Sequence, residues 1–381
     1  MDELNKIYVE PTNRCNLNCV TCIRHSWNEP FGDMEWPVYQ ALIDGIKGFP
    51  GPKTIAFAGL GEPLLHKRFP EMVRLAHEQG MRTEMTSNAT LLTPALAEEL
   101  IEAGLDQFTV SIDGTSDEAH GSVRPGASLE KIIQNVRKLY GWSEKQVSHR
   151  LDIESTLGLA LSAPLRIGIE FVAMKRNIHE LPALRDIAYQ ARASFILVTN
   201  FLPYTADLQN EILYRWATSY EGQGWFQNPL WVLPRMEWNR ETGESLSKLM
   251  LSQPDLSCLD MNPSQRNNYC PFIQSGSMAV AWHGGVSPCP PLLHSYTCFI
   301  MNRQKYFRRC VFGGLPGQSL LAIWSNPEYA AFRERVRKFE FSPCTDCGGC
   351  HLGEKNEEDC YGNPFPVCGD CLWARGVLRC A

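Results

Sequence analysis

The sequence predicts an α/β fold in which a parallel sheet with helices outside it is followed by a small cysteine-rich domain. Over the first 200 residues, short apolar segments with strand character alternate with segments of helical periodicity, six times in all. Such alternation is typical of a parallel sheet covered by helices. The 15 cysteines are also split, with three at positions 15–22 and the other twelve after residue 257. That split indicates a second domain.

The predicted elements follow one another closely. The strands share short buried-type apolar runs and cover residues 6–10, 54–58, 82–86, 107–112, 166–172 and 195–199. The helices carry apolar residues at a helical spacing and cover residues 36–46, 70–79, 93–103, 129–140 and 181–193. Proline near the first position of two of them fits a helix start.

Two segments have no clear periodicity. Residues 141–164 are interpreted as an insertion, and residues 203–269, with four tryptophans, as a bridging segment. These tryptophans either line a substrate cavity or fill the seam between domains. The predicted domains are therefore 1–202, 203–269 and 270–381.

Composition excludes several classes of protein. Apolar residues make up 44% and charged residues 20% of the 381 positions, as in globular proteins. The 36 basic residues are balanced by 42 acidic ones without a basic block, so nucleic acid is not an expected partner. No apolar run approaches the roughly 18 residues of a membrane span, and the N-terminus lacks the pattern of a secretory signal. We expect a cytoplasmic protein without membrane contact, whose reduced thiols favour metal binding over disulfides.

The first candidate site is a loop with the spacing Cys-x3-Cys-x2-Cys. Cys15, Cys19 and Cys22 follow directly after the first predicted strand. A 4Fe–4S cluster has four iron corners, normally held by four thiolates. Three cysteines in a tight loop would hold three corners and leave one iron free for another ligand. A chance triplet or part of a zinc site is the alternative interpretation.

Glycine-rich or polar residues follow the next three strands. They are Gly59, Gly61, Glu62 and Pro63, then Ser87 and Asn88, then Ser111 and Asp113. Functional residues of such folds gather at the C-terminal ends of the strands. The glycines allow a close backbone approach, and the polar groups are suited to an ammonium group or a ribose. Each segment taken singly is equally consistent with a turn or a helix cap.

The C-terminal region holds a second set of clustered cysteines. Eight of them, Cys270, Cys289, Cys344, Cys347, Cys350, Cys360, Cys368 and Cys371, suffice for two further 4Fe–4S clusters. Two zinc sites of four cysteines each fit the same count, and spacing alone leaves both open. The remaining Cys258, Cys298, Cys310 and Cys380 are interpreted as small buried hydrophobes or free thiols, with Cys258 or Cys298 as a possible fourth ligand.

The first 200 residues resemble the radical S-adenosylmethionine (radical SAM) superfamily. The resemblance implies a partial (β/α)6 barrel whose three-cysteine loop holds a 4Fe–4S cluster, with the open iron bound by S-adenosylmethionine (SAM). It implies that Gly59 to Pro63 bind the methionine end, with Glu62 at the amino group. The polar residues after the third and fourth strands would contact ribose or carboxylate. Thr21 stands where the family usually has an aromatic residue beside the adenine. The reaction implied is reductive cleavage to a 5′-deoxyadenosyl radical, which abstracts hydrogen from a substrate.

The C-terminal cysteine order is similar to the SPASM extension of peptide- and protein-modifying radical SAM enzymes. That extension implies two auxiliary iron–sulfur clusters. By analogy, the ligands of the first cluster are Cys270, Cys289 and Cys360. The ligands of the second cluster are Cys344, Cys347, Cys350 and Cys371. Cys368 either completes the first set or takes the place of Cys371 in the second. Segments 10–15, 22–27, 168–177 and 363–366 are further similar to maturases associated with tungsten-cofactor oxidoreductases. A peptide, a protein or a tungsten–pterin cofactor is then the expected substrate, and reduced ferredoxin or flavodoxin the electron donor.

Two residues are candidates for substrate chemistry. His25 follows the cysteine loop directly, although a capping or solvated histidine fits equally well. Glu170 lies on a predicted strand and, if it points into the barrel, is a costly unpaired carboxylate. Two other functions remain open, a peptide-modifying enzyme of the sulfatase-maturase kind and a non-catalytic iron–sulfur electron carrier or metal-binding scaffold.

Overall fold

The computed structural model describes residues 3–51, 53–157, 165–215, 225–226, 231–252, 258–259, 268–345, 347 and 350–380. Within these ranges, the side chains of 148–157, 225–226, 252 and 258–259 are not described.

Six parallel strands form the centre of the molecule and are neighbours in chain order. They are β1 (Lys6–Val9), β2 (Thr54–Phe57), β3 (Arg82–Ser87), β4 (Gln107–Ser111), β5 (Arg166–Ala173) and β6 (Phe195–Asn200). All five pairings between them are parallel. The predicted strands are confirmed to within two residues, and their C-terminal ends meet along one edge of the sheet.

Helices cover the outside of this sheet. They are α1 (Trp36–Ile46), α2 (Phe69–Glu78), α3 (Pro94–Glu102), α4 (Asp117–Val123), α5 (Leu129–Leu157) and α6 (Leu184–Gln190). Apolar residues of strands and helices, such as Ile55, Phe108 and Val136, are fully buried between the two layers. The hydroxyl of Thr93 caps α3 by accepting a hydrogen bond from the backbone N–H of Leu96 at 3.2 Å.

Two of the predicted helices differ from the structure. Helix α5 continues from the predicted segment to Leu157, so most of the supposed insertion at 141–164 is helical. Only Gly141 interrupts its sequence with a poor helix former, and a single such residue does not end a long helix. The predicted helix at 181–193 is a 3₁₀ segment, η3 (Ile178–Ala183), followed by the shorter α6. Pro182 lies inside η3, where it cannot donate the hydrogen bond that a regular helix needs.

The C-terminal region extends the same sheet. Its elements are α8 (Pro271–Gln274), β10 (Ser277–Val280), β11 (Gly285–Ser287), β12 (Tyr296–Ile300), β13 (Arg303–Phe307), β14 (Gly313–Gly314), α9 (Leu320–Trp324) and α10 (Pro327–Lys338). Strand β10 pairs in parallel with β1, and β11 and β14 follow it in antiparallel. Trp324 and Phe332 lie on separate helices, because Asn326 caps a new start at Pro327.

The bridging segment contributes α7 (Gly243–Ser252) and the short strands β7 (Trp225–Phe226), β8 (Trp231–Val232) and β9 (Cys258–Leu259). Strand β8 pairs in parallel with β6 at the far edge of the sheet. Trp231 is fully buried in the core, whereas Trp238 is 54% exposed. Trp216 and the side chain of Trp225 lie outside the described residues.

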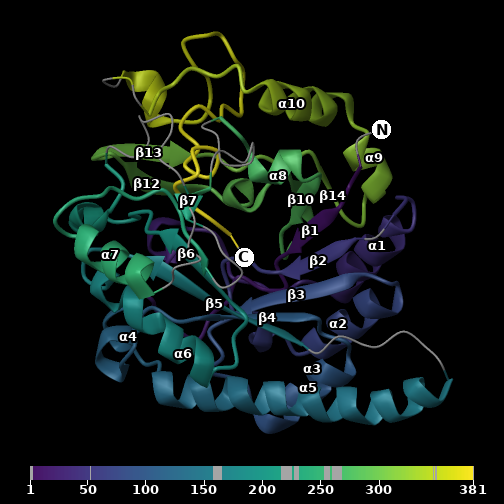
Figure 1. Cartoon of the computed structure of the whole chain (residues 1–381). Coiled ribbons are helices and arrows are strands. Elements are labelled where there is room, and N and C mark those ends of the chain that lie inside the picture. The colour runs from purple at the N-terminus through teal and green to yellow at the C-terminus, as the bar shows by residue number, and fades with distance from the viewer. Residues whose placement is uncertain are drawn as a thin grey trace.

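Figure 1 shows how these parts are arranged. Helix α5 runs along the bottom of the molecule, and the region after residue 270, drawn in green to yellow, lies on the opposite side of the strands. The C-terminal end of the chain runs back to the strands, where the backbone N–H of Arg379 donates to the hydroxyl of Thr199 at 2.9 Å. The helices of the described residues include none that is both long and apolar enough to cross a membrane.

Candidate active site

The three-cysteine loop lies at the C-terminal end of β1, and its sulfurs receive hydrogen bonds from three other segments. Arg24 Nε donates to the Cys22 sulfur at 3.2 Å, Asn88 Nδ2 to the Cys15 sulfur at 3.8 Å, and Arg124 Nη1 to the Cys19 sulfur at 3.8 Å. Two of these donors are cationic, which stabilises thiolates and the negative charge of an iron–sulfur cluster.

The protonation of these thiols depends on opposing effects. Burial raises the pKa of Cys15 and of Cys19, while the guanidinium groups of Arg24 and Arg124 act in the lowering direction. A metal displaces the proton, because the thiolate is the ligand. In this loop, burial therefore favours the protonated thiols, whereas the two nearby guanidinium groups favour the thiolates that bind metal.

The segment from Gly59 to Pro63 packs directly against the cysteine loop. The backbone N–H of Glu62 donates to the carbonyl of Arg14 at 2.7 Å. A Cβ atom on Gly61 would lie 2.2 Å from the carbonyl oxygen of Thr12, so only glycine permits this approach. One on Gly59 would lie 2.8 Å from the side chain of Glu10. The glycines thus allow this segment to pack beside the cysteine loop.

Glu62 connects the ends of two strands. Its buried carboxylate accepts hydrogen bonds from the Ser87 hydroxyl at 2.8 Å, the backbone N–H of Asn88 at 2.8 Å and that of Leu64 at 3.1 Å. Burial raises the pKa of Glu62. A carboxylate has about four lone-pair positions, so one acceptor position is left for a ligand. Glu62, Ser87 and Asn88 are therefore brought together beside Cys15.

Asp113 is fully buried and has both oxygens engaged. Oδ1 accepts from the backbone N–H of Val172 at 2.7 Å, and Oδ2 accepts from Arg124 Nε at 2.6 Å. Burial works against the charge of Arg124, but the Asp113 carboxylate raises the pKa of the guanidinium. Asp113 thus positions the cation that reaches Cys19, a contact that the sequence prediction of ribose binding did not include.

Arg124 itself was missed by the sequence analysis. It follows α4, a helix that was also not predicted, and nothing in its local sequence marks it as a site residue. Only the folded chain brings it to Asp113 and Cys19.

A cavity of about 690 Å³ opens beside this loop, within the barrel. Its wall combines Gly59 and Thr86 from the strand ends, Glu170 from β5, and Tyr296, Trp373 and Cys380 from the C-terminal region. Burial raises the pKa of Glu170 to about 7, so its carboxyl group exchanges protons near neutral pH. Ser111, the register partner of Glu170 on β4, is buried next to it.

His25 is placed differently from Glu170. Its Nε2 lies 2.9 Å from the carbonyl oxygen of Cys19, so the ring contacts the backbone of the cysteine loop. It is not among the residues that line the cavity. Of the predicted site residues, Gly59 and Glu170 therefore line the cavity, whereas His25 lies against the cysteine loop.

A buried ionic network joins the barrel to the C-terminal region. His294 Nε2 lies 2.9 Å from Glu10 Oε2, and His294 Nδ1 lies 2.5 Å from Glu29 Oε2. Burial alone would lower the pKa of His294, but its bonds to the two carboxylates raise it to about 9. Sequence reasoning missed this network, because its members are 265 and 284 positions apart.

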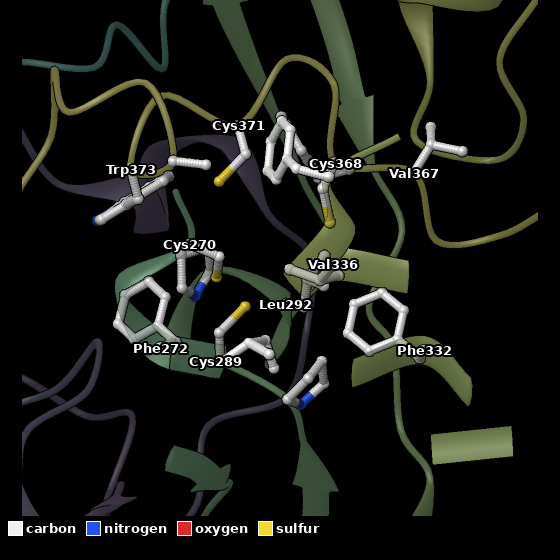
Figure 2. Close-up of a pocket in the computed structure, with 16 residues that line it drawn as sticks. Cys270, Phe272, Cys289, Leu292, Phe332, Val336, Val367, Cys368, Cys371 and Trp373 are labelled. Atoms are coloured by element: carbon white, nitrogen blue, oxygen red, sulfur yellow. The ribbon is translucent and has the colours of Figure 1, made fainter. Parts of the chain in front are cut away.

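Four of the C-terminal cysteines surround a second cavity, of about 520 Å³ (Figure 2). They are Cys270, Cys289, Cys368 and Cys371, and Figure 2 shows them facing one another among Phe272, Leu292, Phe332, Val336 and Val367. Burial in these apolar surroundings raises the pKa of all four thiols. Four thiols around one enclosed space match the ligand number of one cluster.

The remaining clustered cysteines lie apart from this cavity. The Cys344 and Cys360 sulfurs both contact the hydroxyl of Ser342, at 3.4 and 3.0 Å. Cys347, Cys350 and Cys360 are exposed. This placement differs from the partition expected by analogy on two points, since Cys360 lies with Cys344, and Cys371 lines the same cavity as Cys270. Gly369 packs closely against the backbone of Ser342, a contact between distant segments that sequence order does not specify.

Comparisons with known proteins identify the family. A model of the radical SAM superfamily matches residues 9–141, and a model of SPASM, an iron–sulfur cluster-binding domain, matches residues 270–351. A tungsten-containing aldehyde ferredoxin oxidoreductase cofactor-modifying protein of Pyrococcus furiosus is 30% identical over 98% of this chain and 96% of its own length. The chain belongs to the radical SAM superfamily and carries a SPASM domain. It is a radical SAM enzyme with a (β/α) barrel.

Solved structures share the fold of this radical SAM enzyme. Streptococcus suis SuiB bound to precursor peptide SuiA superimposes with a TM-score of 0.58 at 14% identity, covering 91% of this chain and 70% of SuiB. Native anSMEcpe with bound AdoMet superimposes with a TM-score of 0.54 at 15% identity, covering 90% of this chain and 86% of anSMEcpe.

The residues present fit the cofactors that a radical SAM enzyme implies. The loop offers three thiols with cationic donors, and the buried carboxylate of Glu62 beside it has one acceptor position left. The buried hydroxyl of Tyr296, in the cavity wall, has no hydrogen-bond partner within the described part of the chain. No three His, Cys, Asp or Glu side chains of the described residues are grouped to hold a single metal ion. A cluster binds each cysteine at a separate iron corner and so spreads its ligands further apart.

Proposed function

We propose that this protein is a radical SAM/SPASM maturase that cleaves SAM reductively and abstracts hydrogen from a substrate held in the barrel cavity. The substrate is a peptide, a protein side chain or a tungsten–pterin cofactor, and the product serves a tungsten-containing oxidoreductase. The observation that carries this proposal is the end-to-end similarity to the cofactor-modifying protein of Pyrococcus furiosus. A non-catalytic electron carrier would have no use for a 690 Å³ cavity beside the cysteine loop.

Each part of the site has a role in this proposal. Cys15, Cys19 and Cys22 hold a 4Fe–4S cluster, and the cations of Arg24 and Arg124 favour its charged forms. When bound, cluster and SAM together supply a 5′-deoxyadenosyl radical. The chain's own work is to orient SAM, exclude water and place the substrate.

The SAM-binding role falls to the segments that meet beside Cys15. Gly59, Gly61, Glu62 and Pro63 pack against the loop, and the free acceptor position of Glu62 suits an ammonium group. Ser87, Asn88 and Ser111 line the neighbouring strand ends and suit carboxylate or ribose oxygens. Asp113 contributes through Arg124, because both of its oxygens are engaged.

We further propose that the SPASM domain holds two auxiliary 4Fe–4S clusters. Cys270, Cys289, Cys368 and Cys371 bind the buried one, and Cys344, Cys347, Cys350 and Cys360 bind the exposed one. The shared cavity of the first set and the shared contact of Cys344 and Cys360 with Ser342 support this division. The exposed set is then the entry point for electrons from reduced ferredoxin or flavodoxin.

The first test is anaerobic reconstitution with iron and sulfide, followed by measurement of 5′-deoxyadenosine formed from SAM and dithionite. We expect steady formation by the unaltered protein, none by Cys19→Ala, and unchanged formation by Cys310→Ala, a buried cysteine outside the proposed sites. Equal formation by Cys19→Ala would overturn the proposal.

The substrate is tested separately. The reconstituted enzyme is incubated with SAM and reductant together with a metal-free tungsten oxidoreductase, its peptides, or the isolated tungsten–pterin cofactor. A mass change in one of these that depends on both SAM and Cys19 identifies the substrate class. SAM cleavage without a change in any of the three would contradict the maturase assignment.

A further inference from the structure

Cys380 lies in the wall of the barrel cavity, away from both proposed sets of cluster ligands. Its sulfur accepts a hydrogen bond from Trp373 Nε1 at 3.2 Å. The chain around it is fixed to the end of β6, since Asn200 Nδ2 donates to the carbonyl of Val377 at 2.8 Å and the N–H of Arg379 donates to Thr199. Cys380 lines the same cavity as Gly59 and Glu170, whereas the four-cysteine cavity does not include it.

A second observation indicates that this part of the cavity receives a ligand. The side chain of Tyr296 is 99% buried, and its hydroxyl finds no partner among the described residues. A buried hydroxyl without a hydrogen bond is costly unless a ligand completes it. Tyr296 lines the same wall as Cys380, and its ring meets Tyr204 edge to face at 5.9 Å. Tyr296 and Cys380 thus line the same cavity.

Trp373 connects this space to the buried cysteine set. It lines both the barrel cavity and the cavity of Cys270, Cys289, Cys368 and Cys371. In Figure 2 it lies at the edge of that second cavity, beside Cys371. One side chain therefore contacts the Cys380 sulfur and borders the proposed site of the buried auxiliary cluster.

We propose that Cys380 is a hydrogen-atom donor of the reaction cavity and that Trp373 links it to the buried auxiliary site. The S–H bond of Cys380 breaks and a C–H bond forms on a carbon radical in the cavity, which leaves a sulfur-centred radical on Cys380. That sulfur regains one electron from a reduced iron–sulfur centre, by way of Trp373, and one proton from the carboxyl group of Glu170. The net change is reduction of the carbon radical by one electron and one proton.

The chemical state of the two groups is consistent with this cycle. A free cysteine thiol has a pKa of about 8.5, so the exposed sulfur of Cys380, which is not a proposed ligand, carries its hydrogen at neutral pH. Glu170, with a pKa of about 7, is able to give a proton under the same conditions. A residue that served as a cluster ligand would need the thiolate instead.

The inference rests on the proposed SAM cleavage and is tested without any substrate. Reconstituted protein is exchanged into D₂O and given SAM and dithionite, and the 5′-deoxyadenosine is analysed for deuterium at C5′. The Cys380 thiol exchanges its proton with solvent, so we expect deuterium in the product of the unaltered protein and of Cys310→Ala. We expect its loss in Cys380→Ala and in Cys380→Ser, because an alcohol O–H bond is too strong to give up its hydrogen.

The outcomes separate the two proposals. Absence of 5′-deoxyadenosine from every variant would overturn SAM cleavage itself. Formation with the same deuterium content in Cys380→Ala and in the unaltered protein would overturn the role of Cys380 alone. With Trp373→Phe we expect deuterium in the first turnover and slower later turnovers, and an unchanged multiple-turnover rate would overturn the link through Trp373.

A readout independent of turnover uses iodoacetamide and peptide mass spectrometry on the iron-loaded protein. Cys380 should be alkylated, since it is accessible and not a ligand, while Cys298 and Cys310 are buried and should not be. SAM should slow alkylation of Cys380 by filling the cavity. Protection of Cys380 by iron loading alone would show it to be a cluster ligand and would overturn the inference.

Discussion

The two cysteine regions of this protein offer the same ligand chemistry in opposite surroundings. At the barrel mouth, Cys15 and Cys22 are partly exposed, and the loop sulfurs receive donors from two arginines and an asparagine. In the SPASM domain, aromatic and aliphatic side chains surround the sulfurs of Cys270, Cys289, Cys368 and Cys371.

If each site holds the cluster proposed for it, this difference indicates what that cluster does. Three cysteines among cations, open to a cavity, suit a cluster that binds a further ligand and accepts an electron. Four cysteines in an apolar enclosure complete the ligand set and exclude other ligands. Because added negative charge is less favourable in apolar surroundings, the buried cluster should also be the harder of the two to reduce.

The largest effects are expected from the cysteines that divide the SPASM domain. Cys368→Ala and Cys360→Ala should each lose about four iron atoms, the content of one cluster. The double variant Cys270→Ala/Cys368→Ala should lose no more iron than either single variant, because both cysteines bind the same proposed cluster. The pair Cys360→Ala with Cys368→Ala should lose about twice as much.

Iron and labile sulfide analysis measures these losses, with Cys310→Ala as the unaffected control. If Cys270→Ala combined with Cys360→Ala lost only one cluster, the division drawn from the two cavities would be incorrect.

The next effect concerns the cation at the barrel mouth. Arg124→Met should lower the free energy of unfolding by about 3–5 kcal/mol, because it leaves the fully buried Asp113 without its ionic partner. Arg82→Met, which breaks the exposed pair with Glu84, should cost only about 0–1 kcal/mol. Denaturant titration of the reconstituted proteins compares them.

Adding Asp113→Asn to Arg124→Met should recover part of the loss, because no charge then remains buried. No recovery would mean that Arg124 stabilises the fold by packing and not by its charge.

A smaller effect concerns the joint between barrel and SPASM domain. The pKa of His294 is raised in the folded state from 6.5 to about 9, so its stabilisation is fully present below pH 6.5 and is lost as the pH rises through about 9. The shift corresponds to roughly 2–4 kcal/mol. Unfolding free energies at pH 6.5 and above pH 9 should differ by this amount, and His294→Gln should remove most of the difference. If the unfolding free energy fell equally with pH in the unaltered protein and in His294→Gln, the pH dependence would come from other groups.

Features that depend on residues close together in the sequence could be predicted from the sequence alone. The six strands, the cysteine loop and the glycine segment were predicted because periodicity and spacing encode them locally. Gly61 packs against the backbone of Thr12, whereas the expected close approach to a ligand stays a prediction. The predicted helix ended at residue 140 because the sequence beyond it has a weaker apolar pattern. In the structure, α5 continues to Leu157.

Features that depend on distant contacts could not be predicted in this way. Arg124 meets Cys19 across 105 positions, and His294 meets Glu10 across 284. The pairing of β10 with β1 joins the SPASM domain to the barrel in one sheet. The grouping of Cys371 with Cys270 depends on that joint and on the fold of the last cysteines, which spacing does not specify.

Electron paramagnetic resonance of the dithionite-reduced protein, with and without SAM, tests the contrast between the two regions most directly. A variant with Cys270→Ala and Cys344→Ala should retain one cluster signal, and SAM should change that signal because the open iron binds it. Cys19→Ala should show only signals that SAM leaves unchanged. A SAM-dependent change in Cys19→Ala, or its absence in the variant that retains only the loop cluster, would contradict the assignment of the open iron to the barrel mouth.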